Sequence, residues 1–387
     1  MPTASENVVD TIARAIAFST VSRESNLQLI EWARQQLEGI GARCRLTYDS
    51  ERRKANLFAS LGPDEPGGVV LSGHTDVVPV DGQKWDTDPF RAEVAEGRIY
   101  GRGTSDMKGF VATALSLAPE FVANGLRQPL HFALSYDEEI GCIGVRGLID
   151  DLDRAGIRPN SVIVGEPTSM RVVIGHKGKH SYRCKVRGLA CHSAYAPQGV
   201  NAVEAAAEIV AYLKGMARRF RDGGPFDPLF DVSHTTVHTG VINGGTALNI
   251  VPKECTFDFE FRHLPGDRPE ALFDEVKQFA ERELLPEMRR TDPNSGFDWE
   301  VLSFMPGLDV SADSDTARLA LGLTQMRDIG KVSYGTEASL FQVAGMPAVV
   351  CGPGSIEQAH KPNEYVSLDQ IAQCEAFLRR LMQRMCG

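Results

Sequence analysis

Short apolar segments that run directly into histidine or carboxylate residues constrain the fold of this chain more than any other feature. Three such segments are Val69–Ser72, Leu130–Ser135 and Ser161–Val164. The polar residues that follow them are His74, Asp76, Glu138, Glu139 and Glu166. Apolar runs of this length are typical of buried strands. In open α/β sheets, binding sites form beyond the carboxyl ends of the strands, so we expect these side chains to lie at such a site.

Segments with helical periodicity alternate with these strands. Asn26–Ile40 repeats apolar residues at helical spacing, and so does Phe110–Val122. Strands that alternate with helices predict an α/β catalytic domain with a mostly parallel central sheet. The chain ends in a predicted helix, Leu368–Met385, for which Ser367 and Gln370 are spaced as a capping box.

The pattern changes after Gly178. The next predicted elements are, in order, a strand His180–Arg187, a helix Asn201–Phe220, strands Thr235–Val241 and Glu254–Arg262, a helix Arg268–Leu285 and a strand Phe297–Ser303. This order indicates a small ferredoxin-like α+β domain inserted into the first one. At 387 residues the chain is also long enough for two cores. We therefore expect residues 1–178 and 305–387 to form one domain and residues 179–304 the other.

Charge and cysteine content narrow the function classes. The formal net charge is -10, which argues against nucleic acid as a partner. No apolar stretch is long enough to span a bilayer, and the first residues do not resemble a signal peptide. The eight cysteines form no CxxC pair and are typical of free thiols. We expect a cytoplasmic protein with a small-molecule substrate and no membrane partner.

Two of the candidate motifs are ambiguous when each is taken alone. His74 and Asp76 share one face of a strand, so the carboxylate can orient the imidazole of a metal ligand; a solvated histidine at a capped strand end is the alternative. Asp106 lies in the glycine-rich segment 101–109, whose spacing fits neither a P-loop nor a dinucleotide fingerprint. It can equally cap the helix that follows.

The consecutive acids Glu138 and Glu139 repel each other unless a cation neutralises them. Adjacent side chains point apart, so one can bind a metal while the other acts as general base; an exposed acidic turn is the alternative. Glu166 ends another strand, and His360 lies in a loop rich in glycine and proline. A loop histidine by itself is usually solvated.

Together these segments offer a ligand set without thiolate, which suits zinc, cobalt or manganese, with zinc the usual occupant of such hydrolytic sites. Two histidines and three carboxylates suffice for two ions that share one carboxylate and one water. The candidate ligands are His74, Asp106, Glu139, Glu166 and His360.

With these motifs assembled, the whole chain resembles the co-catalytic zinc amidohydrolases, a family that includes acetylornithine deacetylases, succinyl-diaminopimelate desuccinylases, aminoacylases and glutamate carboxypeptidases. The motifs that carry the resemblance are Gly-His-Thr-Asp-Val-Val-Pro at 73–79, Gly-Arg-Gly-Thr-Ser-Asp-Met-Lys-Gly at 101–109, Glu-Glu at 138–139, Gly-Glu-Pro-Thr at 165–168 and the late His360.

The resemblance implies a role for each of these positions. His74 and Glu166 would hold one of two zinc ions per subunit, for which cobalt can substitute. Glu139 and His360 would hold the other. Asp106 would bridge the two ions, with the Asp106–Met107 peptide in the cis form. Asp76 would orient His74, and Glu138 would transfer a proton from the bridging water to the leaving amine.

The resemblance also implies that the inserted domain is a dimerisation domain and the protein a homodimer. His192 matches a histidine that reaches the partner's site and stabilises the oxyanion there. Asn249 and Arg262 match positions that bind polar groups of the substrate, and a planar guanidinium suits an α-carboxylate. The alternative for Arg262 is a surface side chain at a strand end.

The segment Tyr334–Ala338 separates members of the family. Its Thr-Glu-Ala pattern is similar to that of acetylornithine deacetylases, and Glu337 would suit the ammonium group of ornithine; a structural hydrogen-bonding role is the alternative. Gly335 stands where many such deacetylases have cysteine. The expected reaction is hydrolysis of N2-acetyl-L-ornithine to L-ornithine and acetate, in arginine biosynthesis. Another N-acyl amino acid deacylase, a desuccinylase, and a non-catalytic metal-binding relative remain open.

Overall fold

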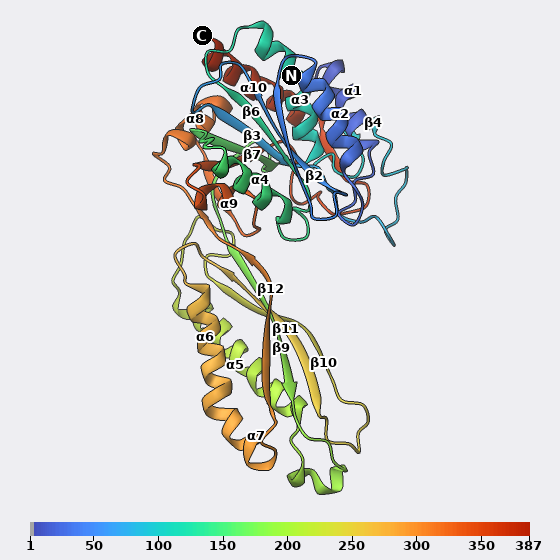
Figure 1. Ribbon diagram of the computed structural model, residues 1–387, viewed down its shortest axis with the longest axis vertical. Helices are drawn as coiled ribbons and strands as arrows, with labels where there is room; N and C mark the ends of the chain where they lie inside the picture. The colour runs from blue at the N-terminus through green and yellow to red at the C-terminus, as the bar shows by residue number, and fades with distance from the viewer. Residues whose placement is uncertain (1–3) are drawn as a thin grey trace. The chain divides into compact units, whose positions relative to one another are not determined.

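The computed structural model describes residues 4–387, which form two compact units (Figure 1). The first unit contains the described part of Met1–Gly175, together with Leu308–Lys331 and Thr336–Gly387. The second contains His176–Gly307 and the short strip Val332–Gly335. The sequence assigned that strip to the first domain, whereas in the structure it packs with the second unit.

The first unit is built on a nine-stranded sheet, in the order β1-β2-β6-β3-β7-β15-β8-β13 with β14 beside β8. The four central strands β6, β3, β7 and β15 are parallel, whereas β1, β2 and β8 run antiparallel to their neighbours. The mostly parallel central sheet predicted from the sequence is therefore confirmed. The strands are β1 Arg43–Tyr48, β2 Ala55–Leu61, β3 Val69–His74, β6 Leu130–Ser135, β7 Ser161–Pro167, β8 Val172–His176, β13 Leu308–Asp309, β14 Ile329–Val332 and β15 Ala348–Gly352.

Helices cover both faces of this sheet (Figure 1). Helix α3 lies on β3 and is flanked by α1 and α10, while α4 and α9 contact each other and lie on β2 and β7. A small sheet of β16, β5 and β4 completes the unit. The bounds are α1 Glu6–Ile16, α2 Leu27–Glu38, α3 Lys108–Ala123, α4 Ile143–Arg154, α8 Asp315–Thr324, α9 Ala338–Val343, α10 Leu368–Cys386, β4 Glu93–Ala95, β5 Arg98–Tyr100 and β16 Tyr365–Ser367.

Two glycines let α3 approach the sheet directly below the predicted ligands. A Cβ at Gly165 would lie 2.0 Å from the ring of Phe110, and one at Gly73 would lie 2.7 Å from Val111. Both distances are far inside van der Waals contact, so larger residues would push α3 away. The glycines immediately before His74 and Glu166 thus fix the depth at which these side chains leave the sheet.

The last helix, α10, has half of the predicted capping box. The Ser367 hydroxyl accepts the backbone N–H of Gln370 at 3.2 Å, as expected for an N-cap. The Gln370 side chain does not return to Ser367. Its carbonyl oxygen accepts the backbone N–H of Gly354 instead, because tertiary packing brings that loop within reach.

The second unit has the β-α-β-β-α-β order predicted for the insert, with a four-stranded antiparallel sheet in the order β10-β11-β9-β12. Alternate residues of β9 and β11 are buried against the helices, as expected for a sheet covered on one face. The elements are β9 Gly178–Arg187, the 3₁₀ turn η1 Ser193–Gln198, α5 Ala202–Gly223, β10 Thr236–Gly244, β11 Glu254–His263, α6 Pro269–Phe279, the π turn η2 Ala280–Leu284, α7 Leu285–Thr291 and β12 Gly296–Met305.

One helix of the second unit is longer than predicted. The sequence places its end at Leu285, but the helical run continues to Thr291. The π turn before α7 sits next to Pro286, which cannot donate a backbone hydrogen bond. The wider hydrogen-bonding pattern of the π turn accommodates a residue without an N–H group. The proline therefore interrupts the helix without ending it.

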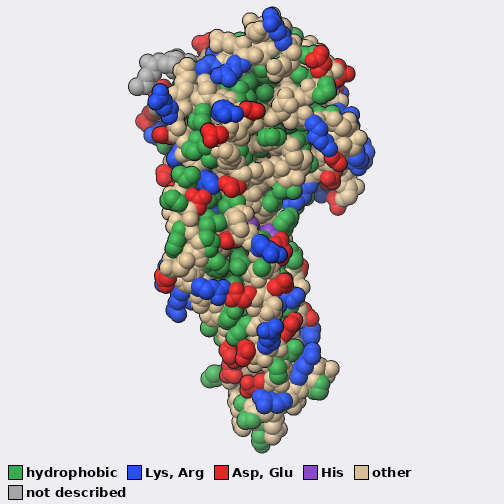
Figure 2. All heavy atoms as spheres, turned by 90° about the vertical axis from the view of Figure 1, so that its left-hand side faces the viewer, with side chains coloured by type: hydrophobic (Ala, Val, Ile, Leu, Met, Phe, Trp, Pro, Cys, Tyr) green, Lys and Arg blue, Asp and Glu red, His purple; other side chains and the backbone are tan. Residues whose placement is uncertain are grey.

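Acidic and basic side chains are intermixed over the face of the molecule seen in Figure 2. All eight cysteines are free thiols. Among residues 4–387, no helix combines the length and the apolar character that a bilayer crossing requires.

Candidate metal centre

The five predicted metal ligands all belong to the first unit, where they come together around the carboxyl ends of the central strands. His74 is the last residue of β3, and Glu166 lies near the end of β7. Glu139 follows β6, Asp106 directly precedes the first turn of α3, and His360 lies in the loop between β15 and β16. Segments far apart in the chain therefore meet because parallel strands end at the same edge.

Asp106 lies between the two histidines. Its Oδ1 is 3.0 Å from Nε2 of His74, and its Oδ2 is 3.2 Å from Nε2 of His360. The peptide bond from Asp106 to Met107 is cis. One carboxylate that presents its two oxygens to two different imidazoles has the arrangement needed to bridge two cations.

The remaining ligands extend this pair on either side. Glu139 Oε2 lies 3.0 Å from Nε2 of His360, and Glu166 Oε1 lies 3.7 Å from Nε2 of His74. Ligand atoms of His74, Asp106 and Glu139 lie within 4.8 Å of one another, as do those of His74, Glu138 and Glu166. The two groups share His74, so the donors form one continuous cluster.

The donor set fits metal ions. Glu139 Oε1 is buried and has no hydrogen-bond partner among the described residues, which is costly for a carboxylate oxygen unless a cation binds it. Nδ1 of His74 lies 2.9 Å from the backbone carbonyl of Asp76. Because a carbonyl only accepts, Nδ1 carries a proton. Nε2 faces Asp106 and Glu166, so it is the nitrogen that can bind a metal once a cation displaces its own proton.

Burial and mutual repulsion shift the titration of the whole cluster. Burial, followed by the nearby Asp106 carboxylate, raises the pKa of Glu166 well above its usual value. Burial also raises the pKa of Glu139 to about 7. Hydrogen bonds to Asp106 and Glu139 raise the pKa of His360 to about 10. For His74, burial alone would lower the pKa, but the hydrogen bond to Asp106 helps to outweigh it and raise the pKa well above the usual value.

Asp76 does more than the sequence predicted for it. Its backbone carbonyl is the nearest acceptor for His74, while its carboxylate Oδ1 stands 3.5 Å from the same Nδ1. The two carboxylate oxygens also accept the backbone N–H groups of Glu138 at 3.1 Å and Glu139 at 3.4 Å. The hydroxyl of Ser22 donates to Oδ2 at 2.7 Å. Asp76 therefore ties the β3 end to the turn that carries both acids.

The acids Glu138 and Glu139 have different neighbours, as expected from adjacent side chains that point apart. Glu139 contacts His360, whereas Oε1 of Glu138 accepts a hydrogen bond from the Cys142 thiol at 3.2 Å. Burial, together with repulsion from Glu139 and Asp106, raises the pKa of Glu138 well above its usual value. A carboxylate with a raised pKa is able to hold a proton near neutral pH, as a general base must during turnover.

Glu337 is buried in the same unit, with 1% of its surface exposed. The Ser135 hydroxyl at the end of β6 donates to its Oε1, and its Oε2 has no hydrogen-bond partner among residues 4–387. Burial raises its pKa to about 7. The hydrogen bond from Ser135 and the near-complete burial favour the structural alternative for this residue.

The other candidate substrate residues belong to the second unit, where they lie at opposite ends of its sheet. His192 forms an isolated bridge with Ile250, and the backbone carbonyl of Asn249 accepts the N–H of Ser193 at 3.0 Å, so His192 and Asn249 are neighbours. Arg262 pairs with Lys179 at the far end of β11. The near end of β11, at Glu254, is the end from which the chain reaches Asn249, and it lies eight residues from Arg262, roughly 26 Å at about 3.3 Å per residue.

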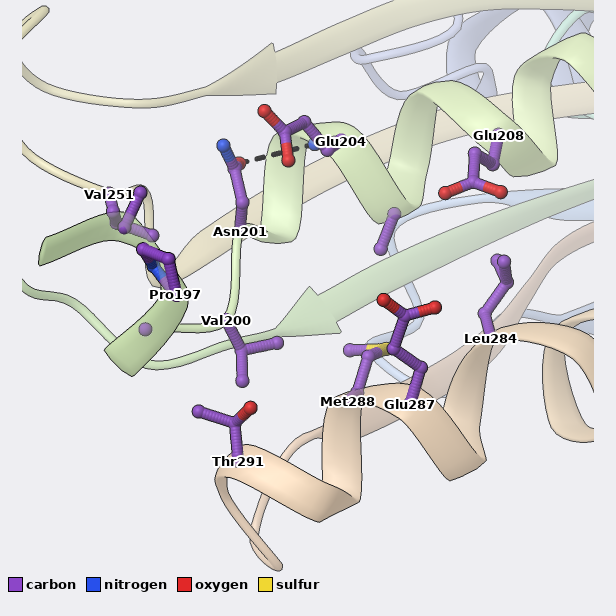
Figure 3. Close-up of a pocket in the computed structure, with 13 residues that line it drawn as sticks. Pro197, Val200, Asn201, Glu204, Glu208, Val251, Leu284, Glu287, Met288 and Thr291 are labelled. Carbon is purple, nitrogen blue, oxygen red and sulfur yellow. Dashed lines mark hydrogen bonds between the residues drawn. The ribbon is translucent and has the colours of Figure 1, made fainter. Parts of the chain in front are cut away.

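A pocket between α5 and α7 lies beside the turn that follows His192 (Figure 3). Glu204 and Glu208 of α5 line it on one side, and Glu287 and Met288 of α7 line it on the other. It contains none of the predicted site residues. The clusters of histidine and carboxylate that could hold a metal, within residues 4–387, are confined to the first unit.

Several residues that support the site in the first unit were not predicted from the sequence. Ser22 and Lys54 come from loops that join the site only in space; Lys54 pairs with Asp137 at 2.5 Å beside the two acids. Glu364 is a buried carboxylate in the His360 loop. No local pattern marks these residues, because their partners are distant in the chain.

Comparison with known proteins agrees with this geometry. Residues 70–384 match the model of peptidase family M20/M25/M40. The chain belongs to this family. It is 36% identical over 387 residues to an acetylornithine deacetylase of Myxococcus xanthus, covering 97% of each chain. It is 32% identical over 364 residues to an acetylornithine deacetylase of Pasteurella multocida, covering 94% of this chain and 92% of the relative. The family predicted from the sequence is thus confirmed.

Solved structures of M20 proteins share the fold. Aminopeptidase PepT from Bacillus cereus matches with a TM-score of 0.79 at 19% identity, covering 100% of both chains. The Bacillus subtilis YXEP protein, described as a dinuclear metal binding peptidase of the M20 family, matches with a TM-score of 0.67 at 13% identity and covers 97% of both chains. At these identities the likeness supports the fold alone.

The pKa values of His360 and Glu139 predict pH-dependent metal binding. With pKa values of about 10 and about 7, the metal-free site holds protons at neutral pH that an incoming cation must displace. The affinity for Co²⁺ should therefore rise with pH, by roughly tenfold per pH unit for each proton displaced. Calorimetric titration of the metal-free protein in buffers of different ionisation enthalpy would measure the released protons.

His360→Ala provides the control for this titration, since it removes the group with the most strongly held of these protons and should release fewer. An affinity that does not change with pH, or binding without proton release, would contradict the assignment of these side chains as metal ligands.

Proposed function

We propose that this protein is a metal-dependent amidohydrolase that converts N2-acetyl-L-ornithine to L-ornithine and acetate. The observation that carries the proposal is the Asp106 carboxylate, whose two oxygens face His74 and His360 with Glu139 and Glu166 beside them. The acetylornithine deacetylases to which the chain is similar over nearly its full length support this substrate. We assign the step to arginine biosynthesis and the protein to the cytoplasm.

We infer a pair of zinc ions per subunit, with cobalt as a possible substitute. His74 and Glu166 would hold one ion, His360 and Glu139 the other, and Asp106 both. When bound, such ions lower the pKa of a shared water and polarise the amide carbonyl. The oxygen and imidazole donors, without a thiolate, suit this choice of metal.

Glu138 is the proposed general base. It comes from the same turn as Glu139, but its Oε1 is directed to the Cys142 thiol and not to His360. Its raised pKa lets it accept the proton of the attacking water and deliver it to the nitrogen of the leaving amine. Asp76, which accepts the backbone N–H of Glu138, holds this carboxylate in position.

Recognition of the amino acid part is assigned to two residues. Arg262 offers a planar guanidinium for the α-carboxylate; its side chain is 33% exposed, with Nε already hydrogen-bonded to Glu260 at 2.9 Å. Glu337 is proposed to attract the side-chain ammonium through its unpaired Oε2. The near-complete burial of Glu337 also fits a structural hydrogen-bonding role. The preference of the enzyme among substrates is therefore a stronger test of the proposed function than a Glu337 variant.

We further propose a homodimer in which the second unit is the dimerisation domain. His192 and Asn249 lie at the opposite end of β11 from Arg262, so one copy of this unit cannot bring all three to one substrate. A second copy resolves this separation if its His192 and Asn249 serve the neighbouring site. There His192 would stabilise the oxyanion of the tetrahedral intermediate, with Asn249 beside it.

A substrate panel tests the proposed reaction. We expect kcat/KM for N2-acetyl-L-ornithine to exceed that for N-acetyl-L-leucine or N-succinyl-LL-diaminopimelate by at least roughly tenfold, because a charged group left unmatched in a polar site is strongly disfavoured. Protein treated with a chelator is the control. Faster turnover of the neutral or succinylated substrate would refute the acetylornithine assignment and leave a different deacylase.

Glu138→Gln tests the general base. The amide keeps the size of the side chain and can still accept from Cys142, but it cannot take a proton. We expect kcat to fall by about 10²- to 10⁴-fold while elemental analysis finds the metal content unchanged. The exposed Glu65→Gln serves as control and should keep wild-type rates. Loss of less than tenfold in kcat would exclude Glu138 as the base.

Hybrid dimers test the shared site. His192→Ala and His74→Ala should each be inactive alone. After mixing and reassociation, about half of the dimers are hybrids with one intact site, so activity should recover to about a quarter of the wild-type value. Hybrids verified by mass spectrometry that show no recovered activity would mean that His192 does not act in the partner's site.

A further inference from the structure

Glu364 is a charged side chain buried within the first unit, four residues after His360, with 1% of its surface exposed. Its Oε1 accepts three backbone N–H groups of the loop before α3: Gly103 at 3.1 Å, Ser105 at 2.9 Å and Asp106 at 3.1 Å. Its Oε2 accepts from Nη1 of Arg102 at 2.7 Å. Glu364 therefore binds the backbone of the residue whose side chain lies between the two histidines.

Arg102 extends this network back to the His360 loop. Its side chain is also 1% exposed, and Nη2 donates to Oε1 of Gln83 at 2.6 Å. The Gln83 side chain in turn donates to the backbone carbonyl of His360 at 2.9 Å, and Nη1 of Arg102 reaches the carbonyl of Lys361 at 3.3 Å. One hydrogen-bonded network thus holds the loops that carry Asp106 and His360.

Neither loop is held by regular secondary structure where it reaches the site. Residues 101–107 lie outside any helix or strand, and His360 has a positive φ of 65°. Buried N–H groups of an irregular loop need partners, and a single carboxylate oxygen supplies three of them here. The hydrogen bonds from this network to the backbones of both loops therefore fix the 3.2 Å contact between Asp106 Oδ2 and His360 Nε2.

We propose that Glu364 is a positioning residue for the metal centre, which sets the Asp106 carboxylate against the His360 imidazole by holding the backbones of both loops. It does not face the donor cluster with its carboxylate oxygens, because both are occupied by the loop and by Arg102. The inference rests on the ligand assignment in the proposed function, and not on the substrate.

Glu364→Gln tests this role in the full-length protein. The amide has one acceptor oxygen, so its NH₂ group must face either the three N–H donors or Arg102, and a donor meets a donor in both orientations. We expect the affinity of the metal-free protein for Co²⁺ to fall by about 10- to 100-fold. The visible absorption of bound Co²⁺ should also change, since it reports the geometry of the ligands.

Glu375→Gln is the matched control. Glu375 is also buried in the first unit, at 3% exposure, and likewise combines a backbone N–H, from Ser5 at 2.7 Å, with an arginine, Arg379 at 2.9 Å. It touches neither ligand loop. We expect this variant to lower thermal stability while its Co²⁺ affinity and spectrum match the wild type.

Two results would overturn the proposal: a Glu364→Gln protein with wild-type Co²⁺ affinity and spectrum, or a Glu375→Gln protein with the same loss. If Glu364→Gln does not fold, Arg102→Lys replaces it. That variant leaves Glu364 in place but cannot bond Gln83 and Lys361 together, and it should weaken Co²⁺ binding by roughly threefold or more; unchanged binding would count equally against the role. The titration uses no substrate, so it remains valid if the acetylornithine assignment fails.

Discussion

Four carboxylates, those of Asp106, Glu138, Glu139 and Glu166, lie around one edge of a buried sheet, where each negative charge raises the energy of the others. Two unit charges 4 Å apart repel by about 4 kcal/mol even at an effective dielectric constant of 20. Burial first, and this repulsion in addition, raise the pKa values of Glu138, Glu139 and Glu166. Such a cluster persists in a stable fold only if protons, histidines or bound cations neutralise it.

The two histidines account for part of that neutralisation and also define its geometry. In the metal-free site they share Asp106, which hydrogen bonds from His360 and His74 keep ionised, with a lowered pKa despite burial. If cations replaced the imidazole protons, the ring nitrogens and the carboxylate oxygens of Asp106 would already point toward them. Proton-bound and metal-bound forms can therefore use one arrangement of side chains, with little rearrangement of the sheet.

Two carboxylates beside the cluster act on backbone and so keep the ligands in place. Asp76 accepts the N–H groups of Glu138 and Glu139, and Glu364 accepts those of the loop that ends at Asp106. Each links segments that come from different strands. The rigid sheet thus sets where the chain arrives, while these buried acids set how the irregular loops beyond it are oriented. Because Asp76 and Glu364 bind backbone N–H groups, the site contains more buried carboxylates than two metal ions need as ligands.

The sequence by itself determined the elements and the donors. Apolar strands followed by His74, Glu139 and Glu166 could be identified because strand burial and polar ends are local patterns, and the order of strands and helices after Gly178 likewise predicted an inserted domain. It could not reveal that Glu364 accepts N–H groups more than 250 residues away, that His192 lies a full strand length from Arg262, or that Pro286 is absorbed by a π turn. Those features arise only when distant segments pack, because hydrogen bonds and charge repulsion depend on distances in space that local sequence does not encode.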